Sequence, residues 1–213
     1  MKKTKSNRTE QNRTEQEEFW ATKHGEDYIG RNDGKYLLAG NLNLFSKIIS
    51  NTEGIKSVLE YGSSTGAALD AIKLLLPDCE LSGVEINKKA ADILKKKYAK
   101  VYYGSMLDFK IDYERDLVFV KGVLINTNPD ELQNAYQKLY EATNRYILVV
   151  EYYNPTPVMV PYHGHDNMLF KRDFAKEIMD KFPNIKLINY GFSYRKDNNF
   201  PQDDISWFLM EKH

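Results

Sequence analysis

From residue 56 onward, short apolar segments alternate with amphipathic segments, and this alternation is the feature that most limits the possible folds. The apolar segments have the length and composition of buried strands, and the amphipathic segments have the spacing of helices. Strands are expected at residues 57–60, 80–86, 101–103, 116–120 and 145–151, and helices at 65–76, 88–98 and 129–143. Strand and helix in succession indicate an α/β fold, in which a doubly wound, mostly parallel sheet carries helices on both faces.

The C-terminal part of the chain departs from this alternation. A helix is expected at residues 173–181, followed by strands at 186–194 and 205–211 with a polar connection but no helix between them. Two strands joined in this way pair in antiparallel fashion, so an antiparallel pair is expected at one edge of the sheet. Residues 152–167 contain three prolines and two histidines and are expected to form a long loop.

The N-terminal part of the chain is expected to lie outside the sheet. Residues 1–18 contain no aromatic and no branched aliphatic side chain, so they cannot bury enough apolar surface to offset the entropy of ordering, and they are predicted to be a disordered polar tail. Residues 19–213 are predicted to form one domain, in which a helical lid at 19–52 precedes an α/β core at 53–213.

The charge composition argues against some classes of function. Thirty basic residues are balanced by thirty acidic residues, which leaves no surplus of positive charge to neutralise the phosphates of a nucleic acid. The longest apolar runs, such as residues 147–150, are far shorter than the ~20 residues that span a bilayer. No apolar segment follows the basic N-terminus, and the single cysteine, Cys79, cannot form an intramolecular disulfide. We expect a cytoplasmic monomer or homodimer without a nucleic-acid or membrane partner.

The segment VLEYGSSTG, residues 58–66, joins the first strand to the first helix of the core. In an open parallel sheet, ligands bind beyond the carboxyl ends of the strands. Gly62 and Gly66 permit a tight turn that brings the backbone close to a bound molecule. Glu85 follows Gly66 by 19 residues and ends the second strand, where a carboxylate can accept hydrogen bonds from both hydroxyls of a ribose.

The spacing of the glycines distinguishes between two kinds of cofactor. A turn that binds a dinucleotide has the pattern G-x-G-x-x-G, whereas here Gly62 and Gly66 are four residues apart with Ser64 between them. Glu60 would repel a pyrophosphate and attract a cation. S-adenosylmethionine carries an ammonium, a sulfonium and a ribose but no phosphate, so it fits this turn. A nicotinamide-dependent oxidoreductase remains as an alternative.

The same segment resembles motif I, E/D-x-G-x-G-x-G, of the class I S-adenosylmethionine-dependent methyltransferases, with Ser64 in place of the middle glycine. The resemblance implies a seven-stranded, Rossmann-like sheet with an antiparallel last strand and S-adenosylmethionine as the cofactor. The cofactor-binding residues that it implies are Glu60, Gly62, Ser63, Ser64 and Gly66 around the turn, Glu85 and Ile86 at the ribose, Ser105 and Met106 at the adenine, and Lys121 and Gly122 at the end of the fourth strand.

Longer segments are similar to the family described as pseudaminic acid biosynthesis-associated methylases. They span residues 17–32, 116–132, 151–174 and 191–212. This resemblance implies a polar small-molecule acceptor, such as a nonulosonic (pseudaminic-type) acid sugar or its precursor, that is methylated on oxygen or nitrogen by in-line transfer. A second alternative is a protein of glycan biosynthesis that binds the cofactor or assists assembly without catalysis.

Catalytic and acceptor-binding candidates lie outside the motif. His163 and His165, in the segment PYHGHD, are candidate general bases, although they are equally consistent with surface imidazoles in a loop. Their H-x-H-D pattern matches no metal signature, so no metal site is expected. The candidates for acceptor binding are Tyr28, Arg31 and Asn32 before the core and Tyr152, Tyr153 and Tyr194 within it.

Overall fold

The structure, a computed structural model, describes residues 13–31, 35–162 and 164–213. Seven strands form one sheet in the order β3-β2-β1-β4-β5-β9-β8. Their bounds are β1 Ser57–Tyr61, β2 Glu80–Glu85, β3 Lys100–Tyr103, β4 Arg115–Lys121, β5 Thr143–Glu151, β8 Ile185–Ser193 and β9 Ile205–Lys212. Strands β1 to β5 pair in parallel, and β9 pairs antiparallel with both β5 and β8. The expected mostly parallel, seven-stranded sheet with an antiparallel last strand is therefore confirmed.

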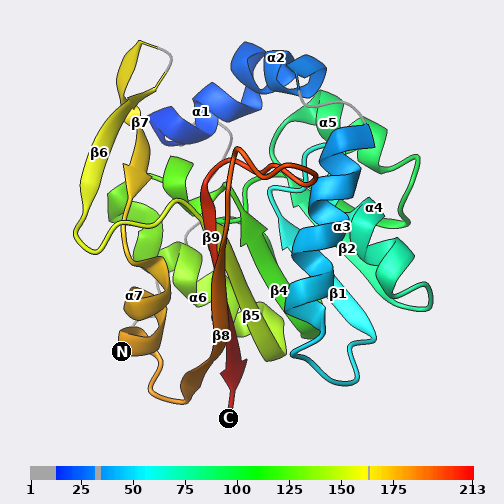
Figure 1. The fold of residues 1–213 in the computed structure, drawn as a ribbon. Helices are drawn as coiled ribbons and strands as arrows, with labels where there is room; N and C mark the ends of the chain where they lie inside the picture. The colour runs from blue at the N-terminus through cyan, green and yellow to red at the C-terminus, as the bar shows by residue number, and fades with distance from the viewer. Residues whose placement is uncertain (1–12, 32–34, 163) are drawn as a thin grey trace.

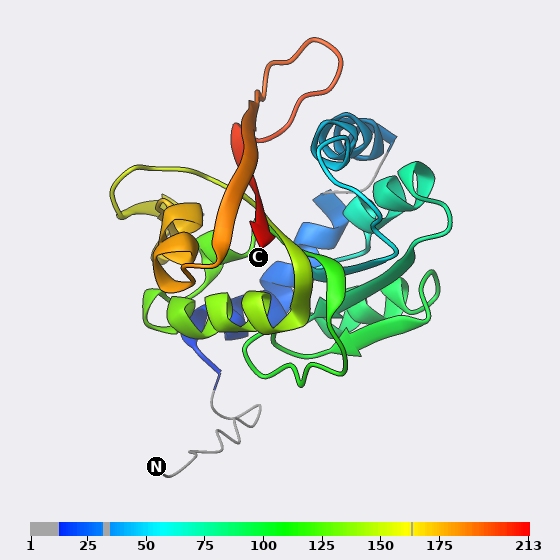
Figure 2. The same ribbon diagram turned by 90° about the horizontal axis from the view of Figure 1, so that it is seen from below.

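Helices cover both faces of this sheet (Figures 1 and 2). On one face lie α3 Lys35–Ile49, α4 Ala67–Leu75 and α5 Lys88–Leu94, and on the other lie α6 Leu132–Ala142 and α7 Phe174–Lys181. Successive residues of a strand point to opposite faces, and β4 shows the result. Leu117 and Phe119 belong to the apolar cluster that contains α3 and α4, whereas Val118 and Val120 belong to the cluster that contains α6 and α7. Burial on both faces explains why the central strands are continuously apolar.

The N-terminus of the described chain is helical, in contrast to the expected tail. Helix α1 spans Glu15–Ala21 and is followed by α2, Lys23–Arg31. A capping box starts α1, because the Thr14 side chain accepts from the Glu17 N–H at 3.2 Å while the Glu17 carboxylate accepts from the Thr14 N–H at 2.8 Å. Residues 15–18 thus belong to α1 rather than to the tail, and Gln16 is only 1% exposed. Residues 1–12 lie outside the described residues.

The segment expected to be a loop after β5 contains a hairpin. Strands β6, Val158–Tyr162, and β7, His165–Lys171, pair antiparallel as a separate two-stranded sheet (Figure 1). The prolines and glycine indicated irregular backbone, but Met168, Leu169 and Phe170 on β7 are buried, and this burial holds the hairpin on the domain. Two short 3₁₀ helices, η2 Leu124–Asn126 and η3 Pro129–Glu131, connect β4 to α6. In the described part of the chain, no helix combines the length and apolar character that a membrane crossing requires.

Candidate functional site

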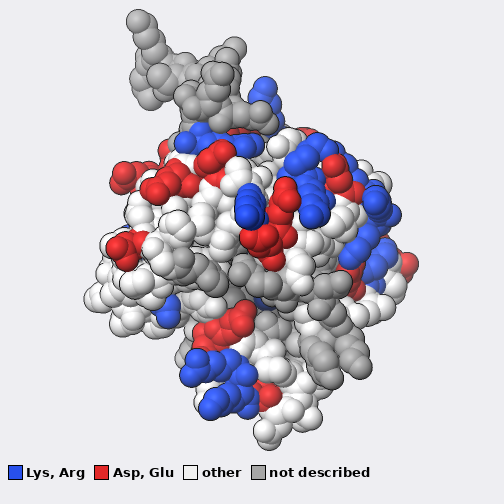
Figure 3. Space-filling model, turned by 90° about the horizontal axis from the view of Figure 1, so that it is seen from above, with Lys and Arg blue, Asp and Glu red and all other residues white. Residues whose placement is uncertain are grey.

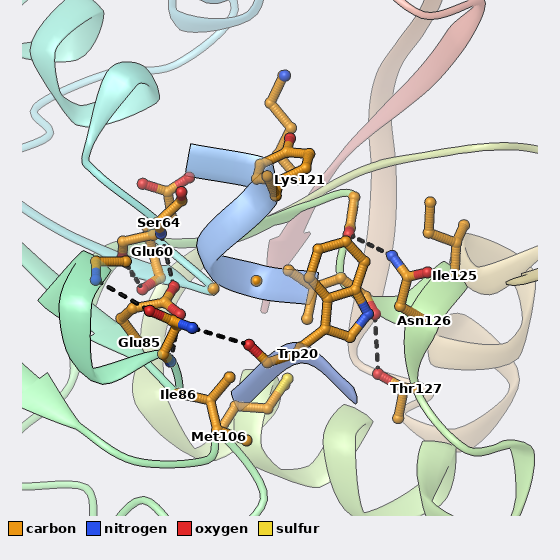
Figure 4. A pocket seen from close by; sticks show the side chains of 18 of the residues that line it. Trp20, Glu60, Ser64, Glu85, Ile86, Met106, Lys121, Ile125, Asn126 and Thr127 are labelled. Carbon is orange, nitrogen blue, oxygen red and sulfur yellow. Dashed lines mark hydrogen bonds between the residues drawn. The ribbon is translucent and has the colours of Figure 1, made fainter. Parts of the chain in front are cut away.

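A cavity of about 370 Å³ lies at the carboxyl ends of β1, β2 and β4. Helices α1 and α2, the β6–β7 hairpin and the connection between β8 and β9 also contribute to its walls. The sheet order changes direction between β1 and β4, which is where open α/β sheets bind their ligands. Figure 4 shows labelled side chains from α1, β1, β2 and β4 around this space.

The turn after β1 is closed by its own backbone hydrogen bonds. The N–H groups of Gly62 and Ser63 donate to the carbonyl of Val84 at 2.8 and 3.2 Å, and the N–H of Gly66 donates to Ser63 at 2.8 Å. Gly62 has a φ of +73°, and a Cβ there would lie 2.4 Å from Cγ2 of Val123. Only glycine satisfies both conditions, so the turn is built to bring backbone against the cavity.

Glu85 ends β2 and is 6% exposed. Its Oε2 accepts from the Ser64 N–H at 2.7 Å, and its Oε1 accepts from the Asn87 N–H at 2.7 Å. Burial raises the pKa of this carboxyl, while the backbone hydrogen bonds oppose the shift. The N–H of Ile86 also acts on this carboxylate, which has about four acceptor positions and lines the cavity, so it retains acceptor capacity for a ligand.

Glu60 precedes the turn and is 3% exposed, with its Oε2 lacking a hydrogen-bond partner among the described residues. Burial raises the pKa of Glu60 to about 8; the nearby Lys121 ammonium lowers it, and the charge of Glu85 raises it. A buried carboxylate that faces a cavity is costly unless a cation or a donor approaches it. The environment of Glu60 therefore favours a positively charged group of a ligand.

Lys121 ends β4, the strand next to β1, and lines the same cavity. Burial lowers the pKa of its ammonium, and the charges of Asp203, Glu60 and Glu151 oppose this shift. None of these carboxylates is within ion-pair distance of Lys121 in the part of the chain that the structure describes. An ammonium in this position is available to an anionic group of a ligand.

Helix η2 forms part of the cavity wall, and Glu151, the last residue of β5, holds it in place by hydrogen bonds. Its Oε1 accepts from the N–H groups of Val123 at 2.8 Å and Leu124 at 2.9 Å, the first residues after the β4 turn. Burial raises the pKa of Glu151 to about 7, and these backbone donors lower it. A carboxylate at the N-terminus of a helical turn satisfies donors that would otherwise be unpaired, so it positions the cavity wall.

Unpaired buried atoms gather around this cavity. In the described residues, Gln16 Oε1, Trp20 Nε1, Glu60 Oε2 and Asn126 Oδ1 are buried without a hydrogen-bond partner, and all four residues line the cavity. Buried polar groups in folded proteins are nearly always hydrogen-bonded. Their concentration at one place indicates that a polar ligand completes the site.

Helix α1 is held over the cavity by side-chain hydrogen bonds to the core. The Nδ2 of Asn87 lies 3.2 Å from the carbonyl oxygen of Trp20 and 3.3 Å from that of Thr22, at the C-terminal end of α1. The Ser105 hydroxyl donates to the carboxylate of Glu17. The Nε2 of Gln16 donates to the carbonyl of Asn167 on β7 at 2.8 Å. These contacts place Trp20 in the cavity wall (Figure 4).

Most of the expected site residues meet in this cavity. The expected residues that line it are Glu60, Gly62, Ser63, Ser64, Glu85, Ile86, Ser105, Met106, Lys121, Gly122, Tyr28 and Tyr152. Gly66 does not line it; it is the N-cap of α4, and a Cβ there would lie 2.6 Å from Leu94. Gly66 therefore serves the packing of α4 against α5 rather than contact with a ligand.

Other expected residues lie elsewhere. Tyr153 and Tyr194 are 42% and 50% exposed and do not line the cavity. His165 is exposed on β7, with its ring centroid 5.2 Å from that of Phe19, and it too lies outside the lining. Asn32 and His163 are outside the described residues, and Arg31 is described only as the last residue of α2.

Trp20 and Asn126 line the cavity and were not expected from the sequence, whereas Tyr162 and Asp203 were weaker candidates for the acceptor pocket. Trp20, Tyr162, Asn126 and Asp203 come from α1, β6, η2 and the β8–β9 connection. Asn87, a further lining residue, carried a local signal, because its position before a helix predicted the cap that it forms with Lys89 and Ala90. The described residues contain no group of three or more His, Cys, Asp or Glu side chains arranged to hold a metal ion.

Solved structures of similar fold include methyltransferases. The glycopeptide N-methyltransferase MtfA complexed with S-adenosyl-L-homocysteine superposes with a TM-score of 0.61 at 11% identity, over 91% of this chain and 99% of that chain. CalS10 from Micromonospora echinaspora, an amino pentose methyltransferase involved in calicheamicin biosynthesis with S-adenosylmethionine bound, gives 0.60 at 11% identity, over 89% and 96%. The chain has the class I methyltransferase fold.

A third structure, DesVI of Streptomyces venezuelae, gives a TM-score of 0.64 at 14% identity, over 90% of this chain and 99% of that chain. No protein-family model and no curated protein sequence matches the chain. At these identities the similarity shows the methyltransferase fold, and the chemistry depends on the cavity of this chain.

Proposed function

We propose that this protein is an S-adenosylmethionine-dependent methyltransferase that acts on a polar small molecule. The observation that carries the proposal is the pair of buried carboxylates, Glu60 and Glu85, that face one cavity at the switch point of the methyltransferase fold. Glu85 retains acceptor capacity for the hydroxyls of a ribose, and Glu60 has an unpaired oxygen for an ammonium. The cofactors bound in MtfA and CalS10 carry both groups.

The turn after β1 argues against a dinucleotide cofactor. A pyrophosphate is held by free N–H groups of the glycine-rich turn and the following helix. Here the N–H groups of Gly62, Ser63 and Gly66 donate to backbone carbonyls, and that of Ser64 donates to Glu85. The Glu60 side chain offers a pyrophosphate no positive charge in either of its protonation states. A nicotinamide-dependent oxidoreductase is therefore the weaker alternative.

Each wall of the cavity has a role in this proposal. Glu85 would bind the ribose, with Ile86 and Met106 packing against the adenine. Glu60 would bind the ammonium of the methionine part, and Lys121 would bind its carboxylate. The cofactor supplies a methyl group already activated by the sulfonium. The remaining task of the chain is to hold an acceptor in line with that methyl group and to exclude water.

The acceptor is proposed to be sugar-like, and the reaction to take place in the cytoplasm of the cell in a monomer or homodimer. Tyrosine hydroxyls and an acidic side chain on the acceptor side of the cavity suit a polar molecule. MtfA acts on a glycopeptide and CalS10 on an amino pentose, according to their descriptions. The resemblance of longer segments to pseudaminic acid biosynthesis-associated methylases supports a nonulosonic acid or its precursor.

Calorimetric titration with S-adenosylhomocysteine tests the cofactor, with NADH titrated in parallel by fluorescence. We expect binding of the first ligand and no change with the second, and the reverse result would overturn the proposal. Transfer of a labelled methyl group to nucleotide sugars and nonulosonic acids then tests catalysis. Binding of the cofactor without transfer to any acceptor in this panel or in a cell extract would favour the non-catalytic alternative.

A further inference from the structure

Four lining residues converge on one side of the cavity although they lie far apart in the sequence. Tyr28 lies on α2, Tyr152 follows β5, Tyr162 ends β6, and Asp203 lies between β8 and β9. They are close enough to affect one another, because the charges of Asp203 and Tyr162 each contribute to the raised pKa values of Tyr28 and Tyr152. Lys121 is within the electrostatic range of Asp203 and of Glu60.

The rings of Trp20, Tyr28 and Tyr162 form a partial cage, and the Tyr152 ring has the Lys171 ammonium 5.1 Å from its centroid. The ring of Trp20 lies 5.5 Å from that of Tyr28, nearly perpendicular to it at 83°, and 6.5 Å from that of Tyr162. Burial is the main cause that raises the pKa of both Tyr28 and Tyr152 to about 12, so these phenols remain neutral at physiological pH. Neutral aromatic faces together with a carboxylate attract organic cations.

The charged side chains of the cavity also favour a cationic group of the acceptor. Among the described residues, four carboxylates, those of Glu17, Glu60, Glu85 and Asp203, line it together with one ammonium, that of Lys121. In the proposed placement, the ammonium of S-adenosylmethionine uses Glu60 and its carboxylate uses Lys121, so neither of these two groups pairs with Asp203. The face of the molecule that carries α1 and α2 bears acidic as well as basic side chains (Figure 3), so an approaching cation meets no uniformly positive surface.

We propose that Trp20, Tyr28, Tyr152, Tyr162 and Asp203 bind an amino group of the acceptor, so that the methyl group is transferred to nitrogen. This inference rests on the proposed methyltransferase function. The acceptor ammonium that this group attracts first loses one proton to solvent; the lone pair so freed forms the new C–N bond, the C–S bond breaks with its electron pair going to sulfur, and the nitrogen keeps its remaining protons as a substituted ammonium. No base is needed for that step, which agrees with a described cavity lining that contains no histidine. The product cation stays within reach of Asp203.

The test compares two probes of the same shape in the presence of S-adenosylhomocysteine. Choline carries a quaternary ammonium, and 3,3-dimethylbutan-1-ol is its neutral carbon analogue. Binding of each probe to the full chain is measured by saturation-transfer NMR and by tryptophan fluorescence, to which Trp207 contributes besides Trp20. We expect choline to bind at least tenfold more tightly than the alcohol, consistent with a desolvated cation–π site.

Variants separate the cage from general effects on the fold. Asp203→Asn and Tyr162→Leu should each reduce the affinity for choline about tenfold while leaving the affinity for S-adenosylhomocysteine within twofold. Asp204→Asn and Tyr190→Leu are matched controls, because neither residue lines the cavity; Asp204 has a φ of +53°, which asparagine tolerates. Both controls should bind choline as the natural chain does.

The experiment distinguishes failure of the amine site from failure of the proposed methyltransferase function. If S-adenosylhomocysteine does not bind, both the proposed methyltransferase function and the proposed amine site are wrong. If S-adenosylhomocysteine binds but choline binds no better than the alcohol, or not at all, the amine site is overturned and the methyltransferase proposal stands. Equal loss of choline binding in Asp203→Asn and Asp204→Asn would also overturn the site.

Discussion

The backbone N–H of Ser64 donates a hydrogen bond of 2.7 Å to Oε2 of Glu85, so the turn after β1 is tied directly to the last residue of β2. The backbone N–H groups of Ser64 and Asn87 donate to this carboxylate, and Glu85→Gln would place an amide NH₂ opposite one of them. Hydrogen bonds to charged groups contribute about 1.5–3 kcal/mol. We expect the affinity for S-adenosylhomocysteine to fall by about ten- to a hundredfold in calorimetric titration.

Glu80 supplies the control for this variant. It lies at the opposite end of β2, exposed, in a surface ion pair with Lys100. Surface ion pairs contribute little, so Glu80→Gln should bind the cofactor as the natural chain does. Equal affinities of the Glu85→Gln and Glu80→Gln variants would remove Glu85 from the site.

The raised pKa of Glu60 predicts that cofactor binding releases a proton. With a pKa of about 8, the Glu60 carboxyl is mainly protonated at pH 7 in the free protein. The ammonium of the ligand favours the charged form, so binding lowers this pKa and affinity increases as the pH rises from about 6 to 8. Titration in buffers of different ionisation enthalpy should show up to one proton released at pH 7. Glu60→Gln should abolish that release, and an unchanged release would assign it to another group.

The same carboxyl predicts how the stability of the free protein depends on pH. Its pKa is higher in the folded state than the ordinary 4.5, so its stabilising contribution is complete below pH 4.5 and is lost as the pH rises to about 8. Urea unfolding at pH 5 and pH 9 should therefore show Glu60→Gln gaining relative to the natural chain at the higher pH, by a few kcal/mol. A constant difference between the two proteins would contradict the assigned burial.

Gly62 predicts a steric effect that can be separated from backbone strain. Gly62 and Gly54 both have positive φ, +73° and +65°, but a Cβ at Gly62 would lie 2.4 Å from Val123, whereas a Cβ at Gly54 has nothing within 4 Å. Gly54→Ala should cost only the left-handed strain of about 1–2 kcal/mol. Gly62→Ala should cost more and should also weaken cofactor binding, because the turn must move.

A second substitution tests the cause of that difference. In Gly62→Ala combined with Val123→Ala, the Val123 methyl group that a Cβ would contact is gone. Urea unfolding should show that the double variant recovers part of the stability lost in Gly62→Ala. If Gly62→Ala costs no more than Gly54→Ala, the close contact with Val123 is not a constraint.

The sequence predicted the sheet and the cofactor side of the cavity because both depend on local patterns. Glu60 and Glu85 end neighbouring parallel strands, and the carboxyl ends of such strands share one edge. The beginning of α1 could also have been recognised, since Thr14 and Glu17 form the spacing of a capping box. The polar composition of the first 18 residues predicted a disordered tail instead of this helix.

The part of the cavity proposed for the acceptor could be predicted only in part, because it depends on contacts between distant segments; Tyr28 and Tyr152 were expected and line it, whereas Trp20 and Asn126 were not expected. Tyr152 lines the cavity while its neighbour Tyr153 is 42% exposed, and only the direction of the extended backbone decides between them. His165 was a reasonable candidate by position, but the β6–β7 hairpin carries it to the surface beside Phe19. The three prolines near that hairpin predicted a loop, although buried apolar residues of β7 hold the hairpin in place.

Asn87 offers a test of whether α1 is needed over the cofactor. Its Oδ1 accepts from the N–H groups of Lys89 and Ala90 at 3.1 Å and caps α5, while its Nδ2 faces the carbonyl oxygens of Trp20, Ala21 and Thr22. Asn87→Asp keeps the cap, because aspartate is as good an N-cap as asparagine, but it turns a carboxylate oxygen toward those carbonyls. Repulsion should therefore release the C-terminal end of α1 without unfolding α5.

Hydrogen exchange measured by mass spectrometry distinguishes these two helices. In Asn87→Asp, amides of residues 15–21 should exchange faster while those of residues 88–94 keep their protection, and the affinity for S-adenosylhomocysteine should fall about tenfold. Asn87→Ala removes the cap as well, at a typical cost of ~1 kcal/mol, so it should increase exchange in both helices. Unchanged exchange of α1 in Asn87→Asp would show that its other contacts, from Gln16 to Asn167 and from Ser105 to Glu17, are sufficient to hold it closed.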